Sequence, residues 1–315
     1  MDIKPKCTAT AIGSLPHPDA AKAVDVVLAS IGSAPIWPQL PRLGLHEQME
    51  IQYSEGMPRV VIDEEKGRMF FDTSGDYSED LASFYEAYMA AEETGDVSAL
   101  AISADFSKGI PALESRLKAE ANGKRPFVKC QTTGPISFAL TIVDENKRAI
   151  YYNEEFVDAV VKALAMKCRW QIQKFRPFAE NVICFIDEPI LSAFGSSTYV
   201  SVQRDDVVAK LNEVITAVQN EGALAGIHCC GNTEWSILVD AGVDILNFDA
   251  HEFGETVALY PEHMRTHLLE RGNALAWGVV PTNKGIREET VESLVAKLEE
   301  GMDHLAAKAD IPKQV

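Results

Sequence analysis

The second half of the chain alternates short apolar runs with longer segments whose apolar residues recur at helical spacing. The apolar runs cover residues 181–189, 223–231, 243–251 and 273–282, and polar residues gather at the carboxyl end of each. Runs that are apolar almost throughout are typical of parallel strands buried on both faces. The amphipathic segments between them predict the connecting helices. This βα repeat restricts the chain to an α/β fold with a parallel sheet.

Such a sheet either closes into a barrel or stays open with helices on both faces. No Gly-rich turn of the GxGxxG type follows the first predicted strand, which disfavours the dinucleotide-binding open sheet. A length of 315 residues is near that of a barrel. We therefore predict a (β/α)8 TIM barrel that forms a single domain over residues 1–315. The expected helices of its second half cover residues 154–175, 205–222, 233–242, 257–272 and 287–306.

The first half of the chain is less regular. Residues 59–72 alternate apolar and polar side chains on both sides of the turn residues Glu65, Lys66 and Gly67. This pattern predicts a β-hairpin inserted into the barrel, to which we assign no function.

The composition excludes several classes of protein. The formal net charge of -18 would repel a phosphate backbone, so we expect no nucleic acid partner. No apolar run approaches the ~20 residues that a membrane helix needs, and the first residues lack a signal-peptide pattern. Six irregularly spaced cysteines do not suggest a disulfide framework. The sequence thus predicts a cytoplasmic protein with free thiols and no membrane partner.

The segment Gly226-Ile227-His228-Cys229-Cys230-Gly231 is the sharpest chemical signal. His228 and Cys230 are two residues apart, so on an extended strand their side chains point to the same side. An imidazole and a thiolate on one face make half of a tetrahedral zinc site. Cys229 would face the opposite way, as a small buried hydrophobe. The next strand ends near Asp249, His251 and Glu252, and adjacent strands lie ~4.8 Å apart, so a carboxylate there could reach the same ion.

Polar residues also follow three other predicted strands. Asp187 ends the apolar run 181–189, where its carboxylate could hold an amine, orient a ligand or act as a base. Residues 10–14 end in Gly13 and Ser14, whose backbone N–H groups and hydroxyl could bind a carboxylate. Residues 131–135, with the sequence QTTGP, have the same placement and are expected to form a pocket wall.

Taken together, these pieces resemble the catalytic C-terminal barrel of cobalamin-independent methionine synthase. The matching stretches span most of the chain and read AIGSLPHP, QTTGPISF, FIDEPIL, GIHCCGNTEW and WGVVPT. That family lies within the uroporphyrinogen-decarboxylase-like superfamily, and the chain is most similar to the short, single-barrel "core" methionine synthases. The resemblance implies a (β/α)8 barrel that transfers a methyl group to a zinc-bound thiol.

The resemblance also implies roles for single residues on the substrate side. The family's Ile-Gly-Ser contact to the amino acid substrate falls on Ile12, Gly13 and Ser14. Its aspartate for the substrate amine falls on Asp187, which would fix the substrate sulfur for attack and is the expected catalytic residue. The substrate and product implied are homocysteine and methionine.

On the metal side, the family's His-x-Cys zinc ligands fall on His228 and Cys230. Its glutamate ligand on the next strand falls on Asp249, with Glu252 as a substitute. The family has a further zinc thiolate in a C-terminal Pro-x-Cys-Gly segment, whereas this chain ends in Pro312-Lys313-Gln314-Val315. Either the given sequence stops short of this segment or the ligand set of the chain is incomplete.

Two departures from the family concern the methyl donor. The acidic residue that the family ties to folate falls on Ala193, and its catalytic histidine falls near Asn283. The long N-terminal barrel of the two-barrel enzymes is also absent. These differences argue against methyltetrahydrofolate and predict methylcobalamin or a corrinoid protein as the methyl donor.

Three alternatives share the predicted fold. The acceptor could be another small thiol such as coenzyme M, although Asp187 disfavours a sulfonate. The barrel could instead be non-catalytic and bind a corrinoid protein or an amino acid. Decarboxylation of a tetrapyrrole is disfavoured because it needs no His-x-Cys pair and because no arginine precedes Arg42.

Overall fold

The computed structural model describes residues 5–120 and 123–312, in which the chain forms two compact units. The N-unit comprises Cys7–Asp187 and Glu213–Ala225. Among the described residues, the C-unit comprises residues 5–6, Glu188–Asn212 and residues 226–312. The single domain expected over the whole chain stays a prediction.

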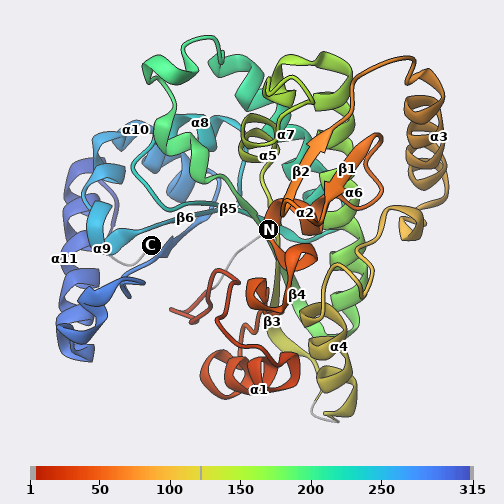
Figure 1. The fold of residues 1–315 in the computed structure, drawn as a ribbon. Helices are drawn as coiled ribbons and strands as arrows, with labels where there is room; N and C mark the ends of the chain where they lie inside the picture. Colours follow the sequence, from red (N-terminus) through yellow and green to blue (C-terminus); the bar gives the residue numbers. More distant parts are fainter. Residues whose placement is uncertain (1–4, 121–122, 313–315) are drawn as a thin grey trace. The chain divides into compact units, whose positions relative to one another are not determined.

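Five parallel strands form one sheet, and each strand pairs with its predecessor in the chain (Figure 1). These strands are β3 (Arg125–Thr133), β4 (Ala179–Asp187), β5 (Leu224–Cys229), β6 (Ile245–Phe248) and β7 (Ala274–Trp277). The last four coincide with the apolar runs of the second half, because a strand buried on both faces needs apolar side chains on both. The predicted α/β fold with a parallel sheet is confirmed.

The predicted hairpin is also confirmed. Strands β1 (Val60–Asp63) and β2 (Arg68–Phe71) pair antiparallel, from Val60 opposite Phe71 to Asp63 opposite Arg68. Gly67 closes the turn with φ 59°, a left-handed conformation that glycine adopts without a Cβ penalty. The ring of Phe71 is fully buried and lies 5.6 Å from that of Phe156, which joins the hairpin to the core of the N-unit.

Two further segments of the N-unit extend the parallel arrangement before β3, each through a single bridge. Ser14 forms a parallel bridge with Gln39, and Ile36 forms one with Lys129 of β3. Backbone hydrogen bonds from Leu15 N to Gln39 O (2.9 Å) and from Lys129 N to Pro35 O (2.9 Å) support this arrangement. The segment that contains Ser14 therefore lies beside residues 35–39, and residues 35–39 lie beside β3.

Helix α6 (Glu154–Phe175) is the longest helix of the N-unit and packs on β3 and β4. The Asn153 side chain caps it by accepting a hydrogen bond from Phe156 N at 3.3 Å. Its inner face buries Phe156 and Phe175 completely, and burying an aromatic side chain contributes roughly 1.5–3 kcal/mol. The other helices of this unit are α1 (Ala20–Ile31), α2 (Met49–Ser54), α3 (Ser78–Thr94), α4 (Gly109–Ala119) and α5 (Pro135–Thr141).

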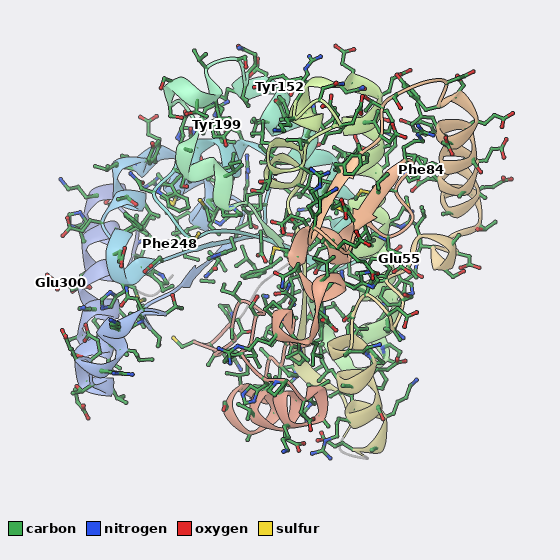
Figure 2. All side chains as sticks on the ribbon, viewed as in Figure 1. Glu55, Phe84, Tyr152, Tyr199, Phe248 and Glu300 are labelled. Carbon is green, nitrogen blue, oxygen red and sulfur yellow. The ribbon has the colours of Figure 1, made fainter. Side chains whose placement is uncertain are left out.

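The C-unit builds its core from aromatic side chains on and beside its strands. The ring of Phe248, labelled in Figure 2, lies 5.5 Å from that of Trp235 and 5.2 Å from that of Trp277. Trp235 begins the helix that follows β5, so the sheet and this helix share one apolar layer. The helices of this unit are α8 (Trp235–Asp240), α9 (Ala250–Phe253), α10 (Pro261–Arg265) and α11 (Val291–Ala309).

Helix α7 (Arg204–Asn220) contributes residues to both units. None of the helices in the described part of the chain combines the length and the hydropathy that a membrane span requires.

Candidate functional site

Three residues in register across β5, β6 and β7 orient the imidazole of His228. His228 is paired with Asn247, and Asn247 with Ala276. The Asn247 side chain donates through Nδ2 to Ala276 O at 2.8 Å, which leaves its Oδ1 to accept. That Oδ1 lies 2.6 Å from His228 Nδ1, so Nδ1 carries the proton in neutral His228. The lone pair of the half-buried ring is therefore on Nε2, the arrangement that a metal-binding histidine needs.

The two adjacent cysteines at the end of β5 differ in environment, as the alternation of a strand predicts. Cys229 is fully buried, and burial raises the pKa of its thiol to about 12. Its predicted role as a small buried hydrophobe is confirmed. Cys230 directly follows the strand and is exposed. Half-buried His228 and exposed Cys230 are thus the two metal-competent side chains at this strand end.

The carboxylates of Asp249 and Glu252, which follow β6, both accept hydrogen bonds from neighbouring residues. Asp249 caps α9, because its Oδ1 accepts hydrogen bonds from His251 N at 3.0 Å and Glu252 N at 3.1 Å. Glu252 is exposed, and its Oε1 accepts a hydrogen bond from Asn283 Nδ2 at 3.1 Å. In the described ranges, no group of three or more His, Cys, Asp or Glu side chains is placed to hold a metal ion. The fit to zinc is therefore limited to His228 and Cys230, and the third protein ligand stays a prediction.

His251, the other side chain considered on this strand end, belongs to a charged cluster with α11. Its Nε2 lies 2.8 Å from Glu289 Oε1 and 2.8 Å from Lys297 Nζ. Lys297 also donates to Glu289 at 2.5 Å, and Ser293 donates to its other oxygen at 2.5 Å. Hydrogen bonds from Lys297, Ser293 and His251 lower the pKa of Glu289 to about 2. The cluster joins the segment after β6 to the first turns of α11.

A backbone contact that sequence reasoning missed lies beside His228. Glu188 follows Asp187, is wholly buried and belongs to the C-unit. Its backbone N–H donates to the His228 carbonyl at 2.8 Å. The sequence shows Glu188 as an acidic residue of the segment DEP, but nothing in the sequence indicates that this residue is buried.

The predicted substrate residues all belong to the N-unit. The carbonyl of Ile12 accepts a hydrogen bond from Lys129 Nζ at 2.5 Å. Gly13 is buried, and a Cβ at this position would lie 2.7 Å from the amide nitrogen Nε2 of Gln131. Ser14 is exposed and its hydroxyl donates to Gln39 Oε1. The chain thus passes so close to β3 that any side chain at the middle position would displace the Gln131 amide.

Asp187 ends β4 opposite Thr133 of β3, and its carbonyl accepts from Gly134 N at 2.8 Å. Its carboxylate is 3% exposed. Two buried groups respond to its charge: Asp187 raises the pKa of Lys129 and, together with burial, that of Tyr53. Asp187 is therefore electrostatically linked to the residue that binds Ile12, so Lys129 joins the two parts of the predicted substrate site.

Sequence reasoning missed Lys129. It lies within the run that precedes the segment QTTGP, and its side chain is fully buried, with Nζ 4.4 Å from the ring centre of Phe185. Burial lowers its pKa to about 8, against the opposing effect of Asp187. A lysine between the apolar residues Val128 and Cys130 was the available signal, because buried lysines are rare unless they are paired.

A cavity of about 320 Å³ lies at the other end of β3, around Gly32, Arg125 and Phe178. Arg125 is paired there with Glu120 and donates to Gly32 O. None of the predicted site residues lines this cavity. The residues after Pro312, where the family has its last zinc thiolate, lie outside the described residues.

Comparison of the sequence with known protein families and with curated proteins finds no match to either.

Proposed function

We propose that the chain is a zinc-dependent methyltransferase that moves a methyl group from methylcobalamin, free or on a corrinoid protein, to the thiol of homocysteine. The product would be methionine. We also propose that the sheet belongs to a (β/α)8 barrel. The support is the strand order, in which β3 to β7 follow one another without the reversal typical of open doubly wound sheets. The bridges of residues 14, 39 and 36 extend this order before β3.

The hydrogen bond between His228 Nδ1 and Asn247 Oδ1 carries the proposal. It leaves His228 Nε2 as the nitrogen that can bind a metal, beside the exposed thiol of Cys230. These two residues would hold zinc, with Asp249 or Glu252 as the further ligand. When bound, zinc lowers the pKa of a coordinated thiol and so supplies a thiolate at neutral pH.

The chain's own residues would bind and orient the amino acid. Backbone N–H groups of Ile12 to Ser14 would donate hydrogen bonds to the carboxylate of the substrate, and the buried carboxylate of Asp187 would bind its ammonium group. Asp187 would act by position, because holding the amine limits where the substrate sulfur can lie. Because the site would bind both the carboxylate and the ammonium group of an amino acid, it would favour homocysteine over a thiol with only one charged group.

The test combines zinc content with a methyl transfer assay. Purified protein loaded with zinc is mixed with methylcobalamin and homocysteine, and methionine is measured by mass spectrometry. We expect His228→Ala and Cys230→Ser to lose both zinc and methyl transfer. Matched controls are His263→Ala, a partly exposed histidine, and Cys7→Ser, the other exposed cysteine. Both should keep zinc and activity.

Two results would overturn the proposal. Full zinc content and full activity in His228→Ala would show that His228 is not a zinc ligand. Methyl transfer from methyltetrahydrofolate but not from methylcobalamin would show that the proposed methyl donor is wrong. Running coenzyme M beside homocysteine in the same assay decides between the two acceptor thiols.

A further inference from the structure

Cys230 lies in the turn between β5 and α8, both labelled in Figure 1. The register of β5 with β6 ends at Cys229, so the pairing of the sheet stops one residue before Cys230. Its thiol is exposed. A metal ligand has to stay within about 0.5 Å of its productive position. A metal site at Cys230 therefore needs contacts that fix the turn itself.

A second segment of the C-unit holds this turn on both sides of the exposed cysteine. It comprises residues 188–192, which we call the clasp segment. On the strand side, the backbone N–H of Glu188 donates to His228 O at 2.8 Å. On the helix side, the hydroxyl of Thr233 donates to Leu191 O at 2.8 Å, and this bond is buried. The two hydrogen bonds attach both ends of the turn to one short segment.

Close packing fixes the middle of the turn. A Cβ on Gly231 would lie 2.6 Å from the Cβ and 3.3 Å from the Oγ of Ser192 in the clasp segment. Carbon atoms that are not bonded to each other pack best at about 3.5–4.0 Å. The backbone of Gly231 therefore lies directly against Ser192, and an added methyl group would push the turn and the clasp segment apart.

The clasp segment is itself well supported. Pro189 begins the short helix Pro189–Ala193, and its ring fixes φ there. The Ser192 hydroxyl donates to Pro189 O at 2.7 Å. The Leu191 side chain is 2% exposed, so the segment is anchored in a core. These contacts make the clasp segment a firm support for the turn after β5.

We propose that Gly231 and Thr233 are positioning residues for the Cys230 thiol. By holding the turn against the clasp segment, they keep the sulfur where it binds zinc together with His228. The inference rests on the proposed function for the metal, and it adds two residues that act only through Cys230. Gly231 allows the close approach, and Thr233 supplies the hydrogen bond that closes the turn.

Replacing Thr233 tests the hydrogen bond. Thr233→Val keeps the volume of the side chain and removes the donor. We expect its zinc affinity to fall at least ~10-fold, as is usual when a residue that orients a ligand is lost. With cobalt(II) in place of zinc, the thiolate-to-metal charge-transfer band should weaken. Thr233→Ser keeps the hydroxyl and should recover both readouts. Equal zinc affinity in Thr233→Val and the parent would overturn the proposal.

Thr256→Val is the matched control for a general loss of stability. Thr256 also lies in the C-unit, donates to Phe253 O at 2.8 Å and accepts from Trp235 Nε1 at 3.1 Å. Its replacement removes two hydrogen bonds, so it should lower the melting temperature at least as much as Thr233→Val does. It should leave the zinc affinity and the cobalt band unchanged. A zinc loss equal to that of Thr233→Val would show that stability, and not position, sets the affinity.

A paired substitution tests the packing contact. Gly231→Ala places a methyl group against Ser192 and should lower zinc affinity at least ~10-fold. Ser192→Gly removes the opposing Cβ, so the double variant should bind zinc nearly as tightly as the parent. Unchanged affinity in Gly231→Ala, or no recovery in the double variant, would overturn the role of this contact.

A spin label on Cys230 gives a readout without metal. Among the described cysteines only Cys7 and Cys230 are exposed, so a nitroxide added to Cys7→Ser reports on Cys230 alone. Thr233→Val should increase the nanosecond mobility of the label, and Thr233→Ser should not. Unchanged mobility in Thr233→Val would overturn the proposal even if that variant binds less zinc.

The positioning role and the proposed function can fail separately. A parent chain that binds no zinc, but whose label responds to Thr233→Val, would keep the positioning role and remove the metal from the proposed function. A parent chain that binds zinc, with neither affinity nor mobility changed in Thr233→Val, would do the reverse.

Discussion

His228 Nδ1 and Asn247 Oδ1 lie 2.6 Å apart on neighbouring strands, and the same asparagine donates to Ala276 O on the next strand. The second bond fixes which end of the amide faces the imidazole, and the first then fixes the tautomer of His228. A chain of two hydrogen bonds across three strands thus leaves Nε2 of His228 as the ring nitrogen with a lone pair. Asn247 acts through His228 and is a positioning residue for the proposed zinc site.

Replacing Asn247 tests this relationship. Asn247→Leu removes the acceptor, and we expect it to lower zinc affinity by roughly 10–100-fold, the usual effect of losing such a partner. Asn247→Asp keeps an acceptor and should recover most of the affinity. Competition with a chelator measures the dissociation constant. Asn273→Leu is the control, since Asn273 also donates to a backbone carbonyl in the C-unit but not beside His228. Equal zinc affinity in Asn247→Leu and the parent would contradict the proposed role.

The contact between Gly13 and Gln131 yields a second prediction. Gly13→Ala places a Cβ 2.7 Å from Gln131 Nε2, so the amide must move. We expect a loss of ~1–3 kcal/mol in the free energy of unfolding, typical of overpacking, together with weaker methionine binding. Denaturant unfolding and titration calorimetry measure the two effects.

A double-mutant cycle with Gln131→Ala is the control for that prediction. Removing the amide makes room for the added methyl, so Gly13→Ala should cost less stability in the Gln131→Ala background. Equal costs in the two backgrounds would show that the destabilisation has another source.

The sequence predicts those parts of the fold that follow from local pattern. The apolar runs mark β4 to β7, the expected helix 154–175 coincides with α6, and the alternation around Gly67 marks the hairpin. These elements follow from periodicity and turn chemistry, which act over a few residues. The expected last helix, 287–306, is displaced to Val291–Ala309, because Thr290 and Ser293 form a capping box there.

The sequence is less informative about the site, since burial and pairing there depend on distant segments. Lys129 donates a hydrogen bond to the carbonyl of Ile12, which lies 117 positions away, and no local pattern shows this contact. Asp249 was expected as a zinc ligand, but its carboxylate also suits a helix cap, and pattern alone cannot choose between these uses. Asn247 is a partner of His228 only through the register of β5 and β6.

The Glu289 cluster predicts a pH-dependent contribution to stability. The pKa of Glu289 is lowered from 4.5 to about 2 in the folded chain, so its ionised form stabilises the fold. That contribution is fully present above the unfolded pKa and is lost as pH falls through about 2. Glu289→Gln should therefore lower the melting temperature at neutral pH, and the difference from the parent should shrink on acidification. Glu288→Gln, at the exposed neighbouring position, is the control and should melt like the parent.

Lys167 predicts a second pH-dependent contribution to stability, of the same sign but in the alkaline range. Burial lowers its pKa from 10.5 to about 8, so between these values the unfolded chain binds more protons than the folded one. Stability from this group therefore rises with pH across that window. We expect the parent to gain ~3 kcal/mol relative to Lys167→Met over the window, measured as the difference in unfolding free energy. Lys118→Met, at an exposed ion pair, serves as control, and a pH-independent difference for Lys167→Met would refute the prediction.

The six cysteines should divide into two classes of reactivity. Cys7 and Cys230 are exposed, whereas Cys130, Cys168, Cys184 and Cys229 are buried. A disulfide reagent added to the native chain should therefore modify two thiols quickly and the other four only on unfolding, because burial blocks access of the reagent to the sulfur. Cys230→Ser should leave one fast thiol. If Cys230 binds zinc, added zinc should slow its modification and leave that of Cys7 unchanged. Equal protection of both thiols would point to nonspecific binding, and no protection of Cys230 would argue against its role as a ligand.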